Sequence, residues 1–480
     1  MFALILLFVY FVSFTDKPEK TAPQLSPRAM EQRQKWNIPT DQMDYPVSPM
    51  YMDSLRHMGV KIFHKSRWFN GVTCEIKDSI LARKVSSFGF VTSVEMTRDN
   101  STSINGVSRR KRPEANGERL MANGSTNWTD QQLALYNLHP LHEAGFEGQG
   151  ILMTVCDGGF YNANTMNAFR QSQELGHFDF TDDADDFYGS TGTHGSECLS
   201  LISGILSDEY GGYYGAATQA DYYLMRSEEL LTESPKEMDN MVVALETADS
   251  LGVNIFSASL GYAMFDNDAW TLNKQTDLDG KHTRCSQAAT IAARKGMLVC
   301  IAAGNEGDSE WRTISAPADA DSILTVGAVG IDSAMAYFSS YGPSSDGRIK
   351  PEVCAVGYQA TVVYPVGDMI ITGNGTSFAT PLMAGFAASL WSALPDENAM
   401  QIRERIIRSA HRYIHPDRAN HMGYGIPDAW KAYTMPVPMG IEAVESGNGD
   451  TENARKVLRG DQILIIRHGH VYNLAGQRIE

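Results

Sequence analysis

Nearly continuous runs of apolar residues recur along the middle of the chain. The first is Ile-Leu-Met-Thr-Val-Cys at 151–156, and further runs lie at 222–225, 253–258, 297–302, 323–326 and near Val353. Segments with helical periodicity separate them, at 197–206, 238–251 and 286–295. Buried strands that alternate with helices are typical of a parallel sheet covered by helices on both faces. We therefore predict an α/β domain, with a mainly parallel sheet between helices, over residues 124–435.

Smaller units flank this domain. Residues 60–64 and 71–76 alternate apolar and polar positions, as half-buried strands do, and helix-like segments lie beside them. These patterns predict a compact α+β unit within residues 17–97, which begins with a polar linker over 17–45. Towards the other end, strand-like runs separated by a turn predict a short β hairpin tail, preceded by a linker, within residues 436–480.

Residues 98–123 join the α+β unit to the larger domain and are polar throughout, with a basic run at 109–112. Such a composition is typical of an exposed linker, where proteolysis concentrates. We expect any processing of the chain to occur in this segment. The simplest interpretation of the basic run itself is solvated linker charge.

Residues 1–14 are almost entirely apolar. This run is too short to span a bilayer and has the length of the hydrophobic region of a signal peptide, although the first basic residue is Lys17. We therefore predict a signal-peptide-like segment at 1–16 and a secreted or cell-surface protein. A buried N-terminal helix is the alternative. No later stretch is long and apolar enough to predict a transmembrane helix.

The composition narrows the class of protein. A length of 480 residues with 43% hydrophobic residues is enough for a substantial core. The formal net charge of −17 argues against nucleic acid or an anionic membrane as a partner, because either would need a basic face. The six cysteines are scattered, without C-x-x-C spacing or histidines at zinc spacing. We expect no disulfide framework and no metal cluster.

Four polar residues stand where strands end or helices begin in the predicted sheet. Asp157 and Asn305 each follow a strand-like run. His194 precedes a helical segment, and Ser377 stands where a turn leads into a helix. Singly, each is more often a turn residue or a helix cap. Together they supply a nucleophile, a base, a group that orients the base and an oxyanion donor, all at one edge of the sheet.

Short motifs enclose these four residues. They read Cys-Asp-Gly-Gly at 156–159, His-Gly-Ser-Glu-Cys at 194–198, Ala-Ala-Gly-Asn at 302–305 and Gly-Thr-Ser-Phe-Ala-Thr-Pro at 375–381. In this set and order the chain resembles the subtilisin-like serine proteases (subtilase family, peptidase S8) from about residue 148 to 433. The resemblance implies a subtilisin-like three-layer fold and a serine endopeptidase. Its catalytic triad would be Asp157, His194 and Ser377, with Asn305 in the oxyanion hole.

The resemblance also implies how a polypeptide substrate is bound. Two segments would line the substrate cleft and its main side-chain pocket, namely Ser259, Leu260 and Gly261, and Ala302, Ala303 and Gly304. Ser315 would lie near the base of the pocket, and residues 226–228 on the other side of the cleft. These small walls favour a medium or large apolar side chain in the pocket.

Further expectations rest on the same resemblance. The α+β unit resembles the family's propeptide, so we expect it to lay its last strand and tail along the cleft as an intramolecular partner. Subtilases often bind calcium, for which the acidic run at 179–186 offers oxygen ligands, but a solvated loop explains this run better and no cofactor is expected. The C-terminal hairpin resembles short sorting or anchoring tails of secreted bacterial proteins. The alternative is a small hairpin with only a packing role.

One departure from the family's pattern leaves an alternative open. The family usually has Ser or Thr after the catalytic Asp, whereas this chain has Gly158. The change removes a hydroxyl that would support Asp157. The alternative is therefore a catalytically impaired, subtilase-like binding or scaffold protein. An α/β-hydrolase esterase is excluded, because the serine motif is not G-x-S-x-G.

Overall fold

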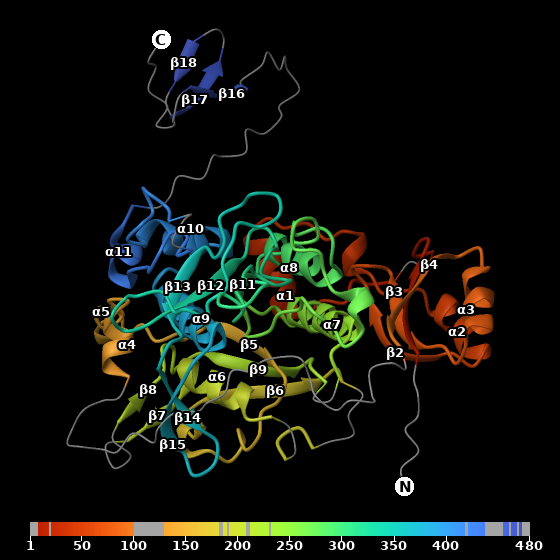
Figure 1. The fold of residues 1–480 in the computed structure, drawn as a ribbon, viewed down its shortest axis with the longest axis horizontal. Coiled ribbons are helices and arrows are strands. Elements are labelled where there is room, and N and C mark those ends of the chain that lie inside the picture. The colour runs from red at the N-terminus through yellow and green to blue at the C-terminus, as the bar shows by residue number, and fades with distance from the viewer. Residues whose placement is uncertain are drawn as a thin grey trace. The chain divides into compact units, whose positions relative to one another are not determined.

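The computed structural model (Figure 1) describes residues 8–18, 21–99, 129–181, 186–189, 192–207, 212–229, 232–417 and 421–436, and the backbone of three strands between 455 and 472. The chain divides into two units, Met1–Pro436 and Val437–Glu480. In the second unit lies an antiparallel sheet of β16 (Arg455–Arg459), β17 (Gln462–Arg467) and β18 (His470–Tyr472). The expected C-terminal β tail is present, with one strand more than a hairpin.

A seven-stranded sheet forms the centre of the first unit. Its order is β13-β12-β11-β10-β5-β9-β6, and every neighbouring pair is parallel. The strands are β5 (Leu152–Asp157), β6 (Gln173–Asp179), β9 (Asp221–Arg226), β10 (Ile255–Ala258), β11 (Leu298–Ala302), β12 (Leu324–Val329) and β13 (Val353–Val356). The predicted parallel sheet is confirmed. Only β6 escaped prediction, because this edge strand alternates exposed and half-buried residues and has no apolar run.

Helices cover both faces of this sheet, which gives the three layers expected (Figure 1). One face carries α6 (His194–Ser203) and α9 (Thr376–Ala393), and the other carries α7 (Pro235–Leu251) and α8 (Arg284–Arg294). Alternate residues of β11 enter the two cores, so that Cys300 faces the first and its neighbours face the second. Both faces of the inner strands are therefore buried, which explains their unbroken apolar runs.

The remaining elements of this domain frame the central helix α9, which is buried from Thr376 to Trp391. Near it pack the short helices α4 (Asp130–Ala134), α5 (His139–Glu143), α10 (Ala399–Ser409) and α11 (Ala429–Thr434). Two antiparallel pairs are β7 (Ile205–Leu206) with β8 (Tyr213–Tyr214), and β14 (Ala360–Tyr364) with β15 (Met369–Gly373). The 3₁₀ turns are η3 (Asn167–Phe169) and η5 (Asp268–Trp270). The β14–β15 hairpin leads directly into α9, so it sets where that helix begins.

Within the first unit, the smaller α+β domain near the N-terminus is a four-stranded antiparallel sheet with helices on one face. Its elements are β1 (Val9–Phe14), α1 (Pro27–Lys35), η1 (Gln42–Asp44), α2 (Pro49–His57), β2 (Lys61–Ser66), β3 (Gly71–Glu75), α3 (Ser79–Ser86) and β4 (Val91–Arg98). The strand order is β2-β3-β1-β4. Helices α2 and α3 share a hydrophobic core with this sheet, and helix α7 of the larger domain also contacts it. The predicted α+β unit is present and lies against the larger domain.

Part of the N-terminal apolar run, expected to belong to a signal-peptide-like segment or to a buried helix, is a strand instead. Residues 9–14 form β1, which pairs with β3 on one side and β4 on the other, and the side chain of Val12 is 0% exposed. An inner strand of this kind is apolar almost throughout, so its run has the same length and composition as the hydrophobic region of a signal peptide. Residues 1–7 lie outside the described part of the chain.

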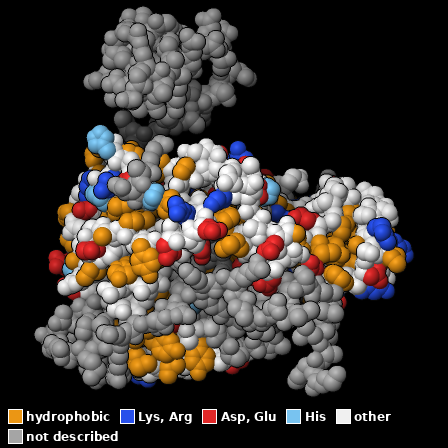
Figure 2. Space-filling view, viewed as in Figure 1, with side chains coloured by type: hydrophobic (Ala, Val, Ile, Leu, Met, Phe, Trp, Pro, Cys, Tyr) orange, Lys and Arg blue, Asp and Glu red, His pale blue; other side chains and the backbone are white. Residues whose placement is uncertain are grey.

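The segment predicted to be a polar linker over 17–45 is also structured. It contains α1 and η1, and it buries the side chains of Arg33 and Asp44. Polar composition misled the prediction because these buried charges are paired, as described below. Within the described residues, no helix has the length and apolar character needed to cross a membrane. Figure 2 shows acidic and basic side chains interspersed over the visible face.

Candidate active site

The predicted acid and base meet at the carboxyl edge of the sheet. Asp157 is the last residue of β5, and His194 is the first residue of α6. The imidazole Nδ1 lies 2.9 Å and 3.0 Å from the two carboxylate oxygens of Asp157. Because an ionised carboxylate can only accept, this nitrogen carries the proton, and Nε2 is left as the basic nitrogen. The backbone N–H of Gly158 donates a further hydrogen bond to Asp157 Oδ1, at 2.7 Å.

The environment of this pair favours a charged imidazole. The Asp157 side chain is 1% exposed, and that of His194 is 22% exposed. Burial is the largest single effect and lowers the pKa of His194, but the charge and hydrogen bond of Asp157, together with the nearby Cys198, raise that pKa well above its usual value. The pair therefore stabilises an imidazolium, which a general base becomes when it accepts a proton.

Ser377 lies beside this pair, in the first turn of α9. Cys198 Sγ lies 3.9 Å from both ring nitrogens of His194 and 3.3 Å from the Ser377 carbonyl oxygen. The Ser377 hydroxyl donates to the carbonyl of Ser259, at 3.3 Å. It makes this bond instead of one to His194, as is common before a substrate tightens the site. The structure thus brings the three predicted catalytic residues to one place.

Asn305 joins the same site from the loop after β11. Its Oδ1 accepts two hydrogen bonds from Thr376, one from the backbone N–H at 2.8 Å and one from the hydroxyl at 3.0 Å. With the oxygen occupied, the NH₂ group is the end of the amide that remains to donate elsewhere. Asn305 and Ser377 line the same cavity. The Thr376 N–H is used by Asn305, and that of Phe378 bonds to the Gly375 carbonyl. A side-chain N–H of Asn305 and the backbone N–H of Ser377 are thus the donors that this arrangement offers at one cavity.

The cavity beside Ser377 has a volume of about 100 Å³. Its walls include five of the six predicted pocket residues, namely Ser259, Leu260, Gly261, Ala302 and Gly304, and Ser315 also lines it as expected. Gly261 is needed there, because a Cβ on it would lie 2.2 Å from the Ser315 hydroxyl. A larger residue would therefore close the pocket.

Ala303 is the predicted wall residue that does not line this cavity. Its side chain is 0% exposed and packs in the core on the other side of the sheet. The reason is the alternation along β11, which continues one residue past its end and turns Ala303 to the same face as Ile301, opposite to Ala302. Sequence reasoning also missed two acids, Glu233 and Glu306, that line the cavity. Glu306 follows Asn305 directly, and that adjacency was the available signal.

The glycine after the acid has a steric explanation. A Cβ at Gly158 would lie 3.3 Å from Cβ of Glu228, a buried residue whose carboxylate accepts a 2.5 Å hydrogen bond from the Tyr262 hydroxyl. A serine or threonine at this position would crowd that group. Asp157 is held instead by the Gly158 N–H and by His194. The departure from the family's pattern therefore leaves Asp157 supported.

Potential metal ligands are few among the described residues. One group of Asp157, His194 and Cys198 places its ligand atoms within 4.8 Å of one another. The ligand atoms of Asp157 and His194 already bond to each other, so the group is better explained as the predicted acid–base pair with a neighbouring thiol. In the acidic run, Asp179 pairs with Arg226 at 3.2 Å. Residues 182–185 lie outside the described part, so the interpretation of this run as a solvated loop, and not a calcium site, stays a prediction.

Comparison with known proteins agrees with this geometry. A sequence model of the "Subtilase family" (peptidase S8) matches residues 148–425, more than half of the chain. A second, described as the "Peptidase S8 propeptide domain, Bacteroidota", matches residues 9–116. The match starts at β1 and includes α1, so both elements belong to the propeptide region.

Individual relatives are distant. Serine protease AprX of Bacillus subtilis (strain 168) is 26% identical over 309 residues, which are 59% of this chain and 66% of that protein. Subtilisin DY of Bacillus licheniformis is 28% identical over 269 residues, 55% of this chain and 85% of that protein. The crystal structure of MycP1 from Mycobacterium smegmatis is 22% identical and matches with a TM-score of 0.53. That match covers 72% of this chain and 94% of MycP1, which shows a shared fold.

Proposed function

This chain belongs to the subtilase family of serine endopeptidases, and we propose that it hydrolyses peptide bonds through Asp157, His194 and Ser377. The observation that carries the proposal is the bond from His194 Nδ1 to both oxygens of the buried Asp157. It leaves Nε2 as the base, next to a serine at a helix start. The Ser377 oxygen attacks the scissile carbonyl carbon while His194 takes its proton. His194 then returns that proton to the leaving amine, and a water repeats the sequence on the acyl-enzyme.

We place the oxyanion of the tetrahedral intermediate between the Asn305 side chain and the backbone N–H of Ser377. The occupied Oδ1 of Asn305 supports this role, because it leaves the NH₂ group as donor. The N–H of Ser377 lies in the first turn of α9, where such groups have no partner within the helix. Both donors are fixed before the reaction, so they need no reorganisation when charge develops.

The substrate would be an extended polypeptide that runs past Ser259–Gly261 with one side chain in the cavity. The small walls of the cavity accept an apolar side chain of medium or large size. The carboxylates of Glu233 and Glu306 disfavour an acidic one, since like charges repel at short range. A panel of peptides that differ only in the residue before the scissile bond tests this assignment. Preference for Asp or Glu at that position would contradict it.

We propose that the tail of the propeptide continues into this cleft. The last residue of β4, Arg98, forms a 2.6 Å ion pair with Glu229, just beyond β9. The next residue, Asp99, accepts a 2.8 Å hydrogen bond from Asn267. Both partners follow segments that the resemblance assigns to the two sides of the cleft. These two contacts bring the last described residues of the propeptide to the protease domain, which supports the proposal.

Secretion or a cell-surface location stays a proposal. Residues 9–14 of the apolar run from which it was first inferred form β1 of the propeptide, so we rest the proposal on the resemblance of the C-terminal unit to sorting tails. Fractionation of producing cells, with antibody detection of the protease domain, tests it. Protein confined to the cytoplasmic fraction would contradict export.

Labelling with a fluorophosphonate probe tests the catalytic proposal, with Ser377→Ala as the control. We expect the processed protein to be labelled and the Ser377→Ala protein not to be. Absence of Ser377-dependent labelling on processed protein would support the alternative, a catalytically impaired binding or scaffold protein.

A further inference from the structure

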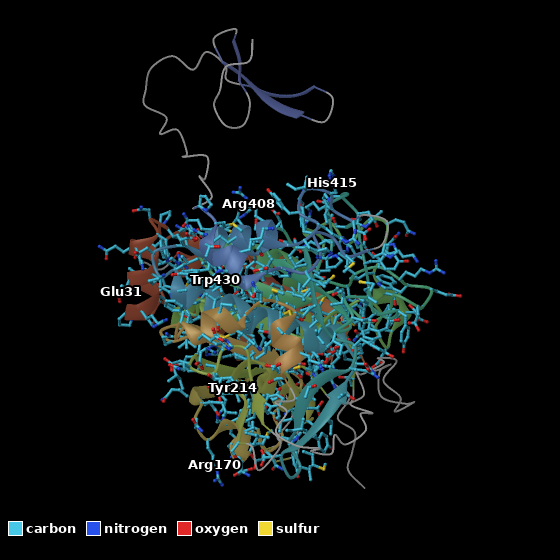
Figure 3. All side chains as sticks on the ribbon, turned by 90° about the vertical axis from the view of Figure 1, so that its left-hand side faces the viewer. Glu31, Arg170, Tyr214, Arg408, His415 and Trp430 are labelled. Carbon is cyan, nitrogen blue, oxygen red and sulfur yellow. The ribbon has the colours of Figure 1, made fainter. Side chains whose placement is uncertain are left out.

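The propeptide touches the protease domain at a place far from the cleft. The connection between β1 and α2 leaves the propeptide sheet and carries α1 onto the protease domain. Helix α1 contacts α7, and Figure 1 shows it away from the rest of the propeptide. Figure 3 shows Glu31 of α1 at the outer side of the protease domain. We call residues 21–47 the strap. Because the strap is an excursion within the propeptide, its contacts add to those of the propeptide sheet.

The strap lies at the amino ends of the central strands. Its exposed Arg28 donates hydrogen bonds to the carbonyls of Gly252 and Gly150, at 3.1 and 3.2 Å, and to Asn254 Oδ1, at 2.8 Å. Gly150 lies two residues before the start of β5, and Asn254 directly precedes β10. The catalytic Asp157 stands at the opposite, carboxyl end of β5. Strands of this length span about 20 Å, so the strap cannot obstruct the cleft.

Buried ion pairs join the strap to α7. Asp249, in the last turn of that helix, accepts a 2.7 Å bond from Arg33 of the strap and a 2.7 Å bond from Arg67 of the propeptide sheet. Arg33 also pairs with Asp44 of the strap, at 3.1 Å, and Asp44 pairs with Lys295 of the protease domain, at 3.0 Å. Arg33 is 4% exposed and Asp44 is 0% exposed. Charges are buried in this way only where each has a partner.

The protease domain is incomplete at this place without the strap. An acid in the last turn of a helix is unfavourable, because the helix dipole is negative there, and α7 has no basic residue in that turn to offset Asp249. Both cations that pair with Asp249 come from the propeptide. The backbone at Gly252 also fits the strap closely, since a Cβ there would lie 2.7 Å from the Ala29 nitrogen. Charge and shape at this surface both match the strap.

We infer that this surface, made by Asp249, Gly252, Asn254 and Lys295, is a second docking surface for the propeptide. It holds the propeptide as a separate folded polypeptide after the chain is cut between Asp99 and Thr129. The grip does not depend on the cleft, so cutting alone leaves a two-chain complex. This inference goes beyond the proposed catalytic function, and it can be tested in an inactive protein.

The test uses full-length Ser377→Ala protein with a recognition site for a site-specific protease placed within residues 109–112. After the cut, size-exclusion chromatography over a dilution series gives the dissociation constant of the two pieces. We expect the pieces to co-elute at micromolar concentration. Arg28→Ala should weaken the complex about tenfold, and Arg33→Met about 100-fold, because charge-assisted bonds across the interface are lost. The matched control is Arg83→Ala, an exposed arginine of α3, with a change within about twofold.

Two outcomes would overturn the inference. The first is separation of the unsubstituted pieces at micromolar concentration. The second is a dissociation constant unchanged by Arg28→Ala. Arg28 is exposed and belongs to neither core, so this variant gives an answer even if Arg33→Met fails to fold.

Discussion

At the scale of single residues, the site depends on which atoms are left free by the hydrogen bonds around it. The amide of Asn305 is oriented by two bonds to its oxygen, so its N–H is the donor that remains. We predict that Asn305→Ala lowers kcat by about 10²–10³-fold and raises KM little, because the donor acts mainly on the transition state. Slow fluorophosphonate labelling should persist. Steady-state kinetics on processed protein check this, and unchanged turnover would show that the oxyanion is held elsewhere.

The pairing of Asp157 with His194 predicts the dependence of activity on pH. Only neutral His194 can accept the serine proton, so kcat/KM rises as the pH passes upward through its pKa. Because Asp157 helps to raise that pKa, the increase in kcat/KM should be centred above the ordinary histidine pKa of about 6.5. In Asp157→Asn the raising charge is lost, so the rise should move to lower pH while kcat falls about 10⁴-fold. A pH profile whose midpoint does not move would contradict the electrostatic role.

The contact of Cys198 with His194 predicts sensitivity of the proposed active site to reagents that modify thiols. The Cys198 sulfur contacts both ring nitrogens of His194, is fully buried, and has a pKa that burial raises. We predict slow inactivation by small mercurials, because an added group displaces the imidazole, and little effect of bulky reagents. Cys198→Ala should keep most of the activity and lose the sensitivity. Full activity after modification of Cys198, verified by mass spectrometry, would remove this idea.

At the scale of elements, substitutions in β1 test whether the N-terminal apolar run is a core strand of the propeptide. An aspartate in place of Val12 would bury a carboxylate without a partner between β3 and β4, at a cost of several kcal/mol. That is comparable to the whole stability of a small domain. We predict that Val12→Asp prevents accumulation of folded full-length protein, whereas Thr92→Asp, at an exposed position of β4, does not. Soluble yield and thermal unfolding of the two variants provide the measurement. Equal yields and equal unfolding temperatures would argue against β1 as a core strand.

The elements also show how far sequence patterns reach. The central strands were predicted because both of their faces are buried, and the catalytic residues because strand ends and helix starts share one edge. The run at 9–14 was misassigned, since an inner strand and a signal peptide have the same apolar composition. The strap was read as a linker because its buried Arg33 and Asp44 are satisfied by residues far away in the chain. Ala303 was wrongly placed in the pocket wall, because the sequence does not show which residues at the end of β11 face the cavity and which face the core.

At the scale of the whole molecule, the propeptide and the protease domain share one chain that passes through residues 100–128. It leaves the propeptide at Asp99, which is bonded to Asn267 of the protease domain, and it returns at Thr129, whose hydroxyl accepts a hydrogen bond from the Tyr214 N–H at 3.0 Å. Both ends of this segment are therefore attached to the protease domain. A cut within it separates two polypeptides without disturbing either of these attachments.

We predict that the protein makes this cut itself, within residues 100–128. The segment is polar, is tethered at both ends, and starts next to the cleft, so its effective concentration at Ser377 exceeds that of any other substrate. Purified wild-type chain should convert to two pieces with a rate that is independent of protein concentration, as an intramolecular reaction requires. The Ser377→Ala chain should remain whole. Mass spectrometry over time, at two concentrations tenfold apart, checks both points. Equal cutting of the Ser377→Ala chain would assign maturation to another protease, and a concentration-dependent rate would assign it to cutting between molecules.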